Sequence, residues 1–163
     1  MYVADATPLI YLAKAEALDV LDGLDVVTTE GVHREVVVAG KEADAPDARR
    51  VERYGVEAVP APESALHERL AESDGLSAVD AGVLALADDR DATALVDDRR
   101  ARTVAEVEGI DVRGTAYLLL SAVDRGEKDG DEARAILDEM VDAGWYCSTS
   151  FYAKIRDRLD EVS

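Results

Sequence analysis

Residues 2–14 read YVADATPLIYLAK, and this segment sets a pattern that the rest of the chain repeats. Tyr2–Ala4 is a short apolar run that favours a buried strand. Thr7 followed by Pro8 is typical of a helix start, with Thr7 as the N-cap and Pro8 at the first helical position. Asp5 stands between the two elements. The segment therefore predicts a strand that delivers an acid to the start of a helix.

Short apolar runs and helical patterns then alternate along the 163 residues. Further strands are expected at 25–28, 56–59, 92–96 and 109–112. Helices are expected at 32–38, 48–54, 78–86, 99–108, from 115 onward, 132–141 and 152–159, and loops at 40–46 and 59–62. This alternation indicates an α/β fold with a mainly parallel central sheet and helices on both faces. The length fits a single domain over residues 1–163.

The charge balance is strongly acidic, with 36 acidic side chains against 18 basic ones and a formal net charge of −18. Near 1 M salt the Debye length falls to about 3 Å, so such a surface suits a halophilic, salt-loaded cell. An acidic patch for a basic partner is disfavoured, because the acids are spread from Asp19 to Glu161. The acidity also differs from the basic footprint of most nucleic-acid binders.

Composition argues against several other classes of protein. No apolar run approaches the ~20 residues of a membrane helix. The N-terminus lacks the basic and apolar regions of a signal peptide, so we expect a cytoplasmic protein with no membrane partner. The single cysteine, Cys147, has no partner for a disulfide or a zinc site. His33 and His67 pair with no serine or cysteine nucleophile, which argues against nucleophilic catalysis.

With so many acids, position must separate a functional carboxylate from a surface one. Asp5 ends the first expected strand and Asp97 ends the strand at 92–96, so both fall at the carboxyl edge of the sheet, where ligands bind. Charge is costly there unless it is paired or bound to a metal. Helix capping is the alternative for each acid. Thr7 is better placed than Asp5 to cap the first helix, whereas Asp97 and Asp98 are both candidates for the next cap.

Two further acids have a less informative setting. Asp80 lies in the first turn of a helix that Ser77 is expected to cap, as in a capping box with Asp in the Glu position. Glu35 lies within an otherwise apolar helix. Taken alone, each is better explained by a structural role. Carboxylates that converge at one strand edge would, however, repel one another unless a cation neutralised them, and hard oxygen ligands favour Mg²⁺ or Mn²⁺.

These same segments resemble PIN domains. DATPLIYLAK at residues 5–14 closely resembles the opening D-x-[ST]-P-L-I-x-L-x-K motif of that family. The resemblance continues in order through Glu35, LSAVDA at residues 76–81, LVDDRRAR at 95–102 and VRGT at 112–115. It spans nearly the whole chain. The pairing of D-D-x-x-A-R with a later G-T resembles a prokaryotic subgroup related to VapC-type toxins.

The resemblance implies a divalent-metal endoribonuclease that hydrolyses RNA with a metal-activated water. The residues it implies are the catalytic acids Asp5, Glu35, Asp80 and Asp97, the Mg²⁺ or Mn²⁺ ligands Asp5, Asp80, Asp97 and Asp98, and the supporting hydroxyls Thr7 and Thr115. This chain has Asp80 where the subgroup usually has Glu. The fourth acid is either Asp97 or Asp98, and Asp97 is favoured because it ends the strand. Glu30 competes with Glu35, although the spacing Val-x-x-Glu-Val favours Glu35.

The resemblance also implies partners. Arg99, Arg100 and Arg102 follow the fourth acid, where the helix dipole disfavours cations. They are either a phosphate clamp for RNA or ion-pair partners for the many acids. A small antitoxin and a homodimer are implied, with the apolar patterns around Leu12 and Leu21 as a candidate interface. The alternative functions are an inactive PIN-fold module that binds RNA or protein, and a housekeeping RNA-processing nuclease.

Overall fold

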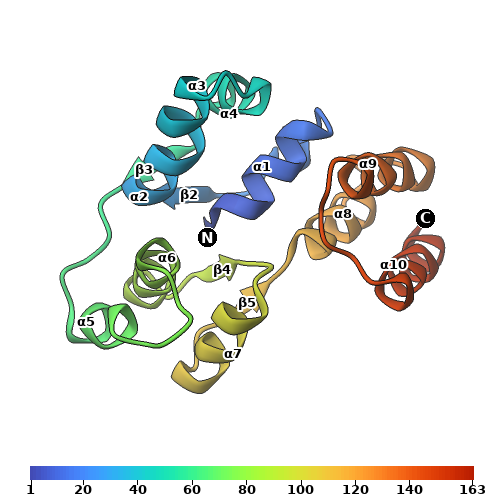
Figure 1. Cartoon of the computed structure of the whole chain (residues 1–163). Helices are drawn as coiled ribbons and strands as arrows, with labels where there is room; N and C mark the ends of the chain where they lie inside the picture. Colours follow the sequence, from blue (N-terminus) through green and yellow to red (C-terminus); the bar gives the residue numbers. More distant parts are fainter.

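The computed structural model describes residues 1–163 and contains one five-stranded sheet covered by helices (Figure 1). The strands are β1 Tyr2–Ala4, β2 Val26–Thr29, β3 Glu57–Val59, β4 Thr93–Leu95 and β5 Val112–Arg113. The α-helices are α1 Ala6–Lys14, α2 Glu30–His33, α3 Ala39–Glu42, α4 Pro46–Tyr54, α5 Ala65–Ala71, α6 Ala78–Asp89, α7 Arg99–Glu108, α8 Thr115–Asp124, α9 Gly130–Asp142 and α10 Thr149–Val162. A 3₁₀ turn, η1 Leu18–Leu21, follows α1, and a π-helical segment, η2 Arg34–Val38, joins α2 to α3.

The predicted parallel sheet is confirmed, because every pairing between neighbouring strands is parallel. The strand order is β3-β2-β1-β4-β5. The chain builds outward from β1 to β3 and then returns to place β4 on the other side of β1. The order therefore switches between β1 and β4, and in open parallel sheets the carboxyl ends of the strands at such a switch point are where ligands bind. Ala4 is in register with Leu95, so Asp5 and Asp97 both emerge at this switch point.

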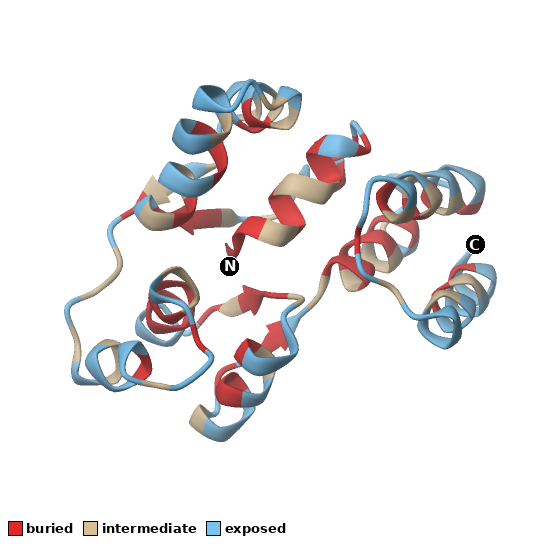
Figure 2. Ribbon diagram, viewed as in Figure 1, coloured by how far each residue is buried: buried red, intermediate tan, exposed pale blue.

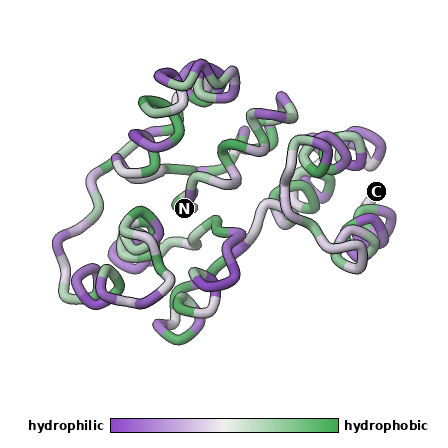
Figure 3. The backbone as a smooth tube through the Cα atoms, viewed as in Figure 1, coloured by the Kyte–Doolittle hydropathy of each residue, from purple (hydrophilic) through white to green (hydrophobic).

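Helices cover both faces of the sheet, as the alternation predicts. On one face α1 packs against η2 and α4; on the other α6 lies across β1, β2 and β4, with α5 and α7 beside it (Figure 1). The last three helices, α8 to α10, pack on one another next to α1 and η1. Buried and apolar segments face the interior of these layers (Figures 2 and 3). No helix has both the length and the apolar character needed to cross a membrane.

One continuous core of 44 buried residues joins the layers. Leu12 and Leu21 belong to it, with 0% and 2% of their surface exposed. Fully burying a leucine side chain stabilises a fold by about 1.5–3 kcal/mol. The proposed dimer interface around Leu12 and Leu21 is therefore wrong for these two residues, because both are committed to the interior of their own chain.

Three local predictions have different outcomes in the structure. Asp5, not Thr7, is the N-cap of α1, because its Oδ1 accepts a hydrogen bond from the Ala6 N–H at 2.8 Å. The segment 40–46 is not entirely a loop, since α3 continues to Glu42. The Ser77 cap is confirmed: its hydroxyl accepts from the Asp80 N–H at 3.0 Å. The reciprocal bond of a capping box is absent, which leaves the Asp80 carboxylate free to face other groups.

Candidate active site

Asp5 lies at the switch point, directly after β1. Its N–H donates to the Leu95 carbonyl of β4 at 3.0 Å, so the backbone is still part of the sheet when the chain turns into α1. Only 5% of the residue is exposed. A carboxylate buried to this degree raises the free energy of the fold unless partners or a cation compensate its charge.

Neighbouring carboxylates increase that cost. The pKa of Asp5 is raised to about 8, chiefly because the side chain is buried. The charge of Asp80, a side-chain hydrogen bond with Asp80 and the charge of Glu35 raise it further. The hydrogen bond from the Ala6 N–H lowers the pKa of Asp5. The fold thus brings together acids from β1, α6 and η2. Of the two candidates for the second acid, Glu35 is among the charges that raise the pKa of Asp5.

Asp97, which follows β4, is held by three hydrogen bonds. Its Oδ1 accepts from the Thr115 N–H at 2.8 Å. Its Oδ2 accepts from the Thr115 hydroxyl at 2.6 Å and from the indole N–H of Trp145 at 3.1 Å. Asp98 has a different environment: its Oδ2 accepts from the Ala101 N–H at 2.9 Å and caps α7. The two adjacent acids therefore have separate roles in the fold.

Gly114 leaves the space that Asp97 occupies. A Cβ at position 114 would lie 2.8 Å from Asp97 Oδ1 and 3.3 Å from Arg102 Nη1. Both residues of the Gly-Thr pair at the start of α8 therefore position Asp97. Gly114 lets the carboxylate approach the backbone closely, and the buried Thr115 donates two hydrogen bonds to it. Thr7 lies half-buried in the first turn of α1 and makes no side-chain hydrogen bond within the chain.

Trp145 was not predicted from the sequence as a site residue. It lies in the loop between α9 and α10, 48 residues from the acid that it contacts, so no local pattern links the two. Only 5% of the side chain is exposed. The one available signal is composition, because Trp145 is the single tryptophan of the chain. That signal marks an unusual residue but does not identify its partner.

The three arginines after the acids form no ion pairs in this structure. Arg100 Nε donates to the Asp74 carbonyl at 2.9 Å, and Arg102 Nη1 donates to the Val96 carbonyl at 3.1 Å. Arg99 is exposed in the first turn of α7. Ion pairing with surface acids therefore does not account for this cluster. The Arg102 guanidinium thus reaches from α7 to the backbone that follows β4, one residue before Asp97.

The carboxylates at the switch point form a sparse donor set for a divalent metal. No three histidine, cysteine, aspartate or glutamate side chains converge closely enough to hold an ion together. Mg²⁺, however, is commonly bound through one or two carboxylates, with water and substrate phosphates completing its shell. Asp5 and Asp80 fit that pattern, because a cation would relieve the repulsion and desolvation that raise the pKa of Asp5.

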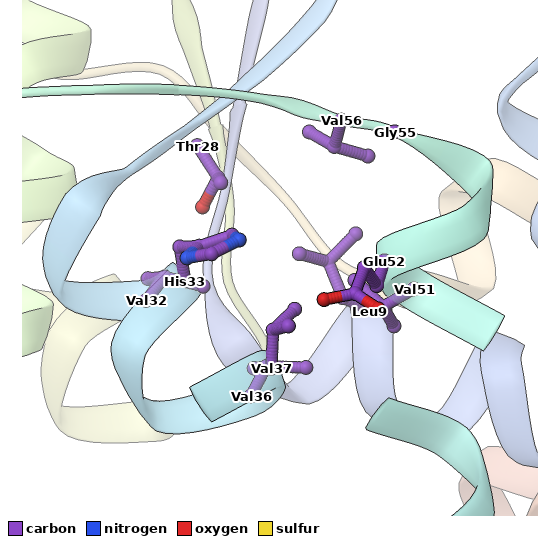
Figure 4. Close-up of a pocket in the computed structure, with 10 residues that line it drawn as sticks. All are labelled: Leu9, Thr28, Val32, His33, Val36, Val37, Val51, Glu52, Gly55 and Val56. Atoms are coloured by element: carbon purple, nitrogen blue, oxygen red, sulfur yellow. The ribbon is translucent and has the colours of Figure 1, made fainter. Parts of the chain in front are cut away.

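A separate cavity of about 130 Å³ lies between α1, η2 and α4 (Figure 4). Its walls are mainly apolar, and its polar lining residues are Thr28, His33 and Glu52. The Thr28 hydroxyl donates to the Ala4 carbonyl at 2.6 Å. None of the acids at the switch point lines this cavity, so it is distinct from the candidate active site.

Comparison with known proteins supports the resemblance seen in the sequence. A family model described as DUF3368, a PIN domain, matches residues 1–161. No curated protein and no solved structure matches the chain. The match covers all five strands and every helix except the last residue of α10.

Proposed function

Since this chain belongs to the PIN-domain family, whose members are typically nucleases, we propose that it is a metal-dependent endoribonuclease. The observation that carries the proposal is the burial of Asp5 against other carboxylates at the switch point of a parallel sheet. This arrangement opposes folding, and strongly perturbed acids of this kind are concentrated at functional sites. The PIN match makes phosphodiester hydrolysis the chemistry that such a site serves.

Asp5 and Asp80 would hold the cation. Bound Mg²⁺ or Mn²⁺ lowers the pKa of a coordinated water and neutralises charge on the phosphodiester. Glu35 adds negative charge from η2, which strengthens the attraction for a cation. Asp98 is better explained as the cap of α7 than as a ligand, because its Oδ2 already accepts the Ala101 N–H.

Asp97 is the fourth acid in this proposal. An ionised carboxylate has about four lone-pair positions. Three are used by the donors of Thr115 and Trp145, so one position on Oδ1 remains. Asp97 is therefore fixed in orientation and still able to bind a cation or a metal-bound water. Thr7, which is part-exposed two residues after Asp5, would contact the substrate or that water.

RNA would bind through local contacts. Arg99 and Arg102 present positive charge next to the acids, and Arg99 is free of ion pairs. The net charge of −18 opposes RNA at low salt. At molar salt, interactions beyond about 3 Å are screened. We therefore place this nuclease in a salt-adapted cytoplasm, where the metal and the adjacent arginines determine binding.

A toxin role in a toxin–antitoxin pair is the finer part of the proposal. It is supported by the pairing of D-D-x-x-A-R at residues 97–102 with Gly114-Thr115, which resembles a subgroup related to VapC-type toxins. A small antitoxin would then hold the enzyme inactive, and the active form would be a homodimer. Expression of the chain in a salt-adapted host is expected to arrest growth, and the product of an adjoining reading frame is expected to restore it. Growth unaffected by expression would favour a housekeeping nuclease.

The chemistry can be tested on a mixed RNA pool in molar KCl with Mn²⁺ or EDTA. Attack by water leaves a 5′-phosphate and a 3′-hydroxyl, whereas attack by the RNA 2′-hydroxyl leaves a cyclic phosphate. We expect 5′-phosphate ends and no cleavage in EDTA. Cyclic phosphate ends, or cleavage that survives EDTA, would contradict the proposed mechanism. RNA binding without cleavage would support the inactive binding module.

A further inference from the structure

The Trp145 side chain connects the C-terminal helices to the acid site. Its indole N–H donates to Asp97 Oδ2 at 3.1 Å, and its ring lies 6.3 Å from that of Phe151 at the start of α10. A buried indole N–H requires an acceptor, and this one uses a carboxylate at the active edge of the sheet. A charged acceptor makes the hydrogen bond stronger than a neutral one.

Backbone hydrogen bonds on both sides of Trp145 fix the position of the loop that carries it. α9 ends in a Schellman motif, in which the Gly144 N–H donates to the Val141 carbonyl and the Trp145 N–H donates to the Met140 carbonyl at 2.9 Å. Gly144 has φ +107°, a conformation that side chains disfavour. Four residues after Gly144, the Ser148 hydroxyl caps α10 by accepting the Phe151 N–H at 3.1 Å. The loop that carries the indole is thus fixed at both ends.

We propose that Trp145 is a positioning residue for Asp97, and this inference rests on the metal-dependent function proposed above. Trp145 and the Thr115 hydroxyl together occupy Oδ2, which leaves the remaining lone pair of Asp97 on Oδ1. Partners of this kind orient a metal-binding carboxylate, and their loss typically weakens metal affinity about 10- to 100-fold. The C-terminal helices are therefore part of the site and not an appended unit.

A purely structural role is the competing explanation, because Trp145 also belongs to the hydrophobic core. The two explanations differ in what Trp145→Phe changes. Phenylalanine keeps an aromatic ring against Phe151 but removes the N–H donor. A structural role predicts lower stability with unchanged metal affinity. A positioning role predicts weaker metal binding by the variant after it has folded.

The test is Mn²⁺ affinity, measured by counting free Mn²⁺ with electron paramagnetic resonance on the full-length protein in molar KCl. We expect Trp145→Phe to weaken binding by about tenfold or more relative to wild type. The matched control is Phe151→Leu, which removes the neighbouring ring but keeps the N–H, and its Mn²⁺ affinity should equal that of wild type. Circular dichroism in EDTA establishes that each variant is folded under the conditions used.

A double-mutant cycle tests whether Trp145 affects Mn²⁺ affinity through Asp97. In an Asp97→Asn background, Trp145→Phe should cause little additional loss of Mn²⁺ affinity, because the charged acceptor is already gone. Independent, additive losses would contradict the proposal. Wild-type Mn²⁺ affinity in folded Trp145→Phe would also overturn it while leaving the nuclease proposal intact. Failure of the wild-type protein to bind Mn²⁺ would overturn both.

Trp145 fluorescence supplies a second readout, since it is the only tryptophan of the chain. Paramagnetic Mn²⁺ bound next to Asp97 should quench its emission saturably, with the midpoint found by electron paramagnetic resonance. Mg²⁺ should reverse the quenching by competition. The quenching should vanish in Asp5→Asn. Quenching that persists unchanged in Asp5→Asn would place the ion elsewhere and contradict the proposed arrangement.

Discussion

Thr115 holds both oxygens of Asp97, with its N–H on Oδ1 at 2.8 Å and its hydroxyl on Oδ2 at 2.6 Å. The first residue of α8 thus sets the orientation of an acid at the end of β4. Because Thr115 is completely buried, no water can replace its hydroxyl when the side chain changes.

Thr115→Val should therefore lower Mn²⁺ affinity and the rate of RNA cleavage by about tenfold or more. Valine keeps the shape of threonine but removes the donor to Oδ2. Thr115→Ser keeps the hydroxyl and should remain close to wild type in both measurements. Equal losses in the valine and serine variants would show that packing, not the hydrogen bond, is what matters at this position.

Gly114→Ala should displace Asp97, because the new Cβ would lie 2.8 Å from Oδ1. That oxygen is held by Thr115 and has little freedom to move, so we expect weaker Mn²⁺ binding together with a lower melting temperature. Gly31→Ala is the matched control. Its Cβ would meet nothing closer than 3.7 Å, and alanine is favoured in a helix. Unchanged Mn²⁺ affinity in Gly114→Ala would contradict the assignment of Asp97 to the metal site.

Asp98→Ala should reduce stability while sparing Mn²⁺ binding. It removes the cap of α7, a loss typically of about 1 kcal/mol in the free energy of unfolding. Asp97→Asn should weaken Mn²⁺ binding more than Asp98→Ala does. Chemical denaturation and Mn²⁺ titration of both variants separate these effects. A larger loss of Mn²⁺ affinity in Asp98→Ala than in Asp97→Asn would show that Asp98, and not Asp97, is the acid of the metal site.

Asp5→Asn should stabilise the metal-free protein in a pH-dependent way. The pKa of Asp5 is raised to about 8 in the folded state from its ordinary value of 3.8, so the unfolded chain loses this proton first as the pH rises. The contribution of Asp5 to stability is complete below pH 3.8 and falls until about pH 8. The advantage of the asparagine variant should therefore grow with pH and level off, exceeding about 1 kcal/mol near neutrality.

Urea unfolding of wild type and Asp5→Asn in EDTA, from pH 4 to pH 9, measures this difference. Comparing the two proteins at each pH cancels the effect of the other acids. A difference in unfolding free energy that does not change with pH would contradict the burial of an uncompensated charge at Asp5.

The sheet and the approximate location of the site could be predicted because they follow from local pattern. Apolar runs that end in Asp5 and Asp97 define strands, and the carboxyl ends of parallel strands meet at one edge. The choice between Asp97 and Asp98 could not be made in this way. Both residues follow the strand and both are good capping residues, so the sequence does not show which one caps α7.

Other details depend on contacts that no local pattern contains. Thr7 and Asp5 are both good capping residues, and Asp5 takes the role because its backbone is held extended by the hydrogen bond to Leu95. Trp145 reaches Asp97 only after three further helices have packed beside the sheet. A residue brought in by tertiary packing leaves no signal in the spacing of the sequence around the acid.

The most direct test of the central claim is the initial rate of RNA cleavage in molar KCl with Mn²⁺, compared among wild type, Asp5→Asn, Asp80→Asn and Asp25→Asn. Asp25 is an exposed acid outside the site and controls for the loss of one negative charge. We predict that Asp25→Asn cleaves like wild type, whereas Asp5→Asn and Asp80→Asn fall to the rate seen in EDTA. Cleavage by Asp5→Asn and Asp80→Asn at the wild-type rate would contradict a catalytic acid site at this edge of the sheet.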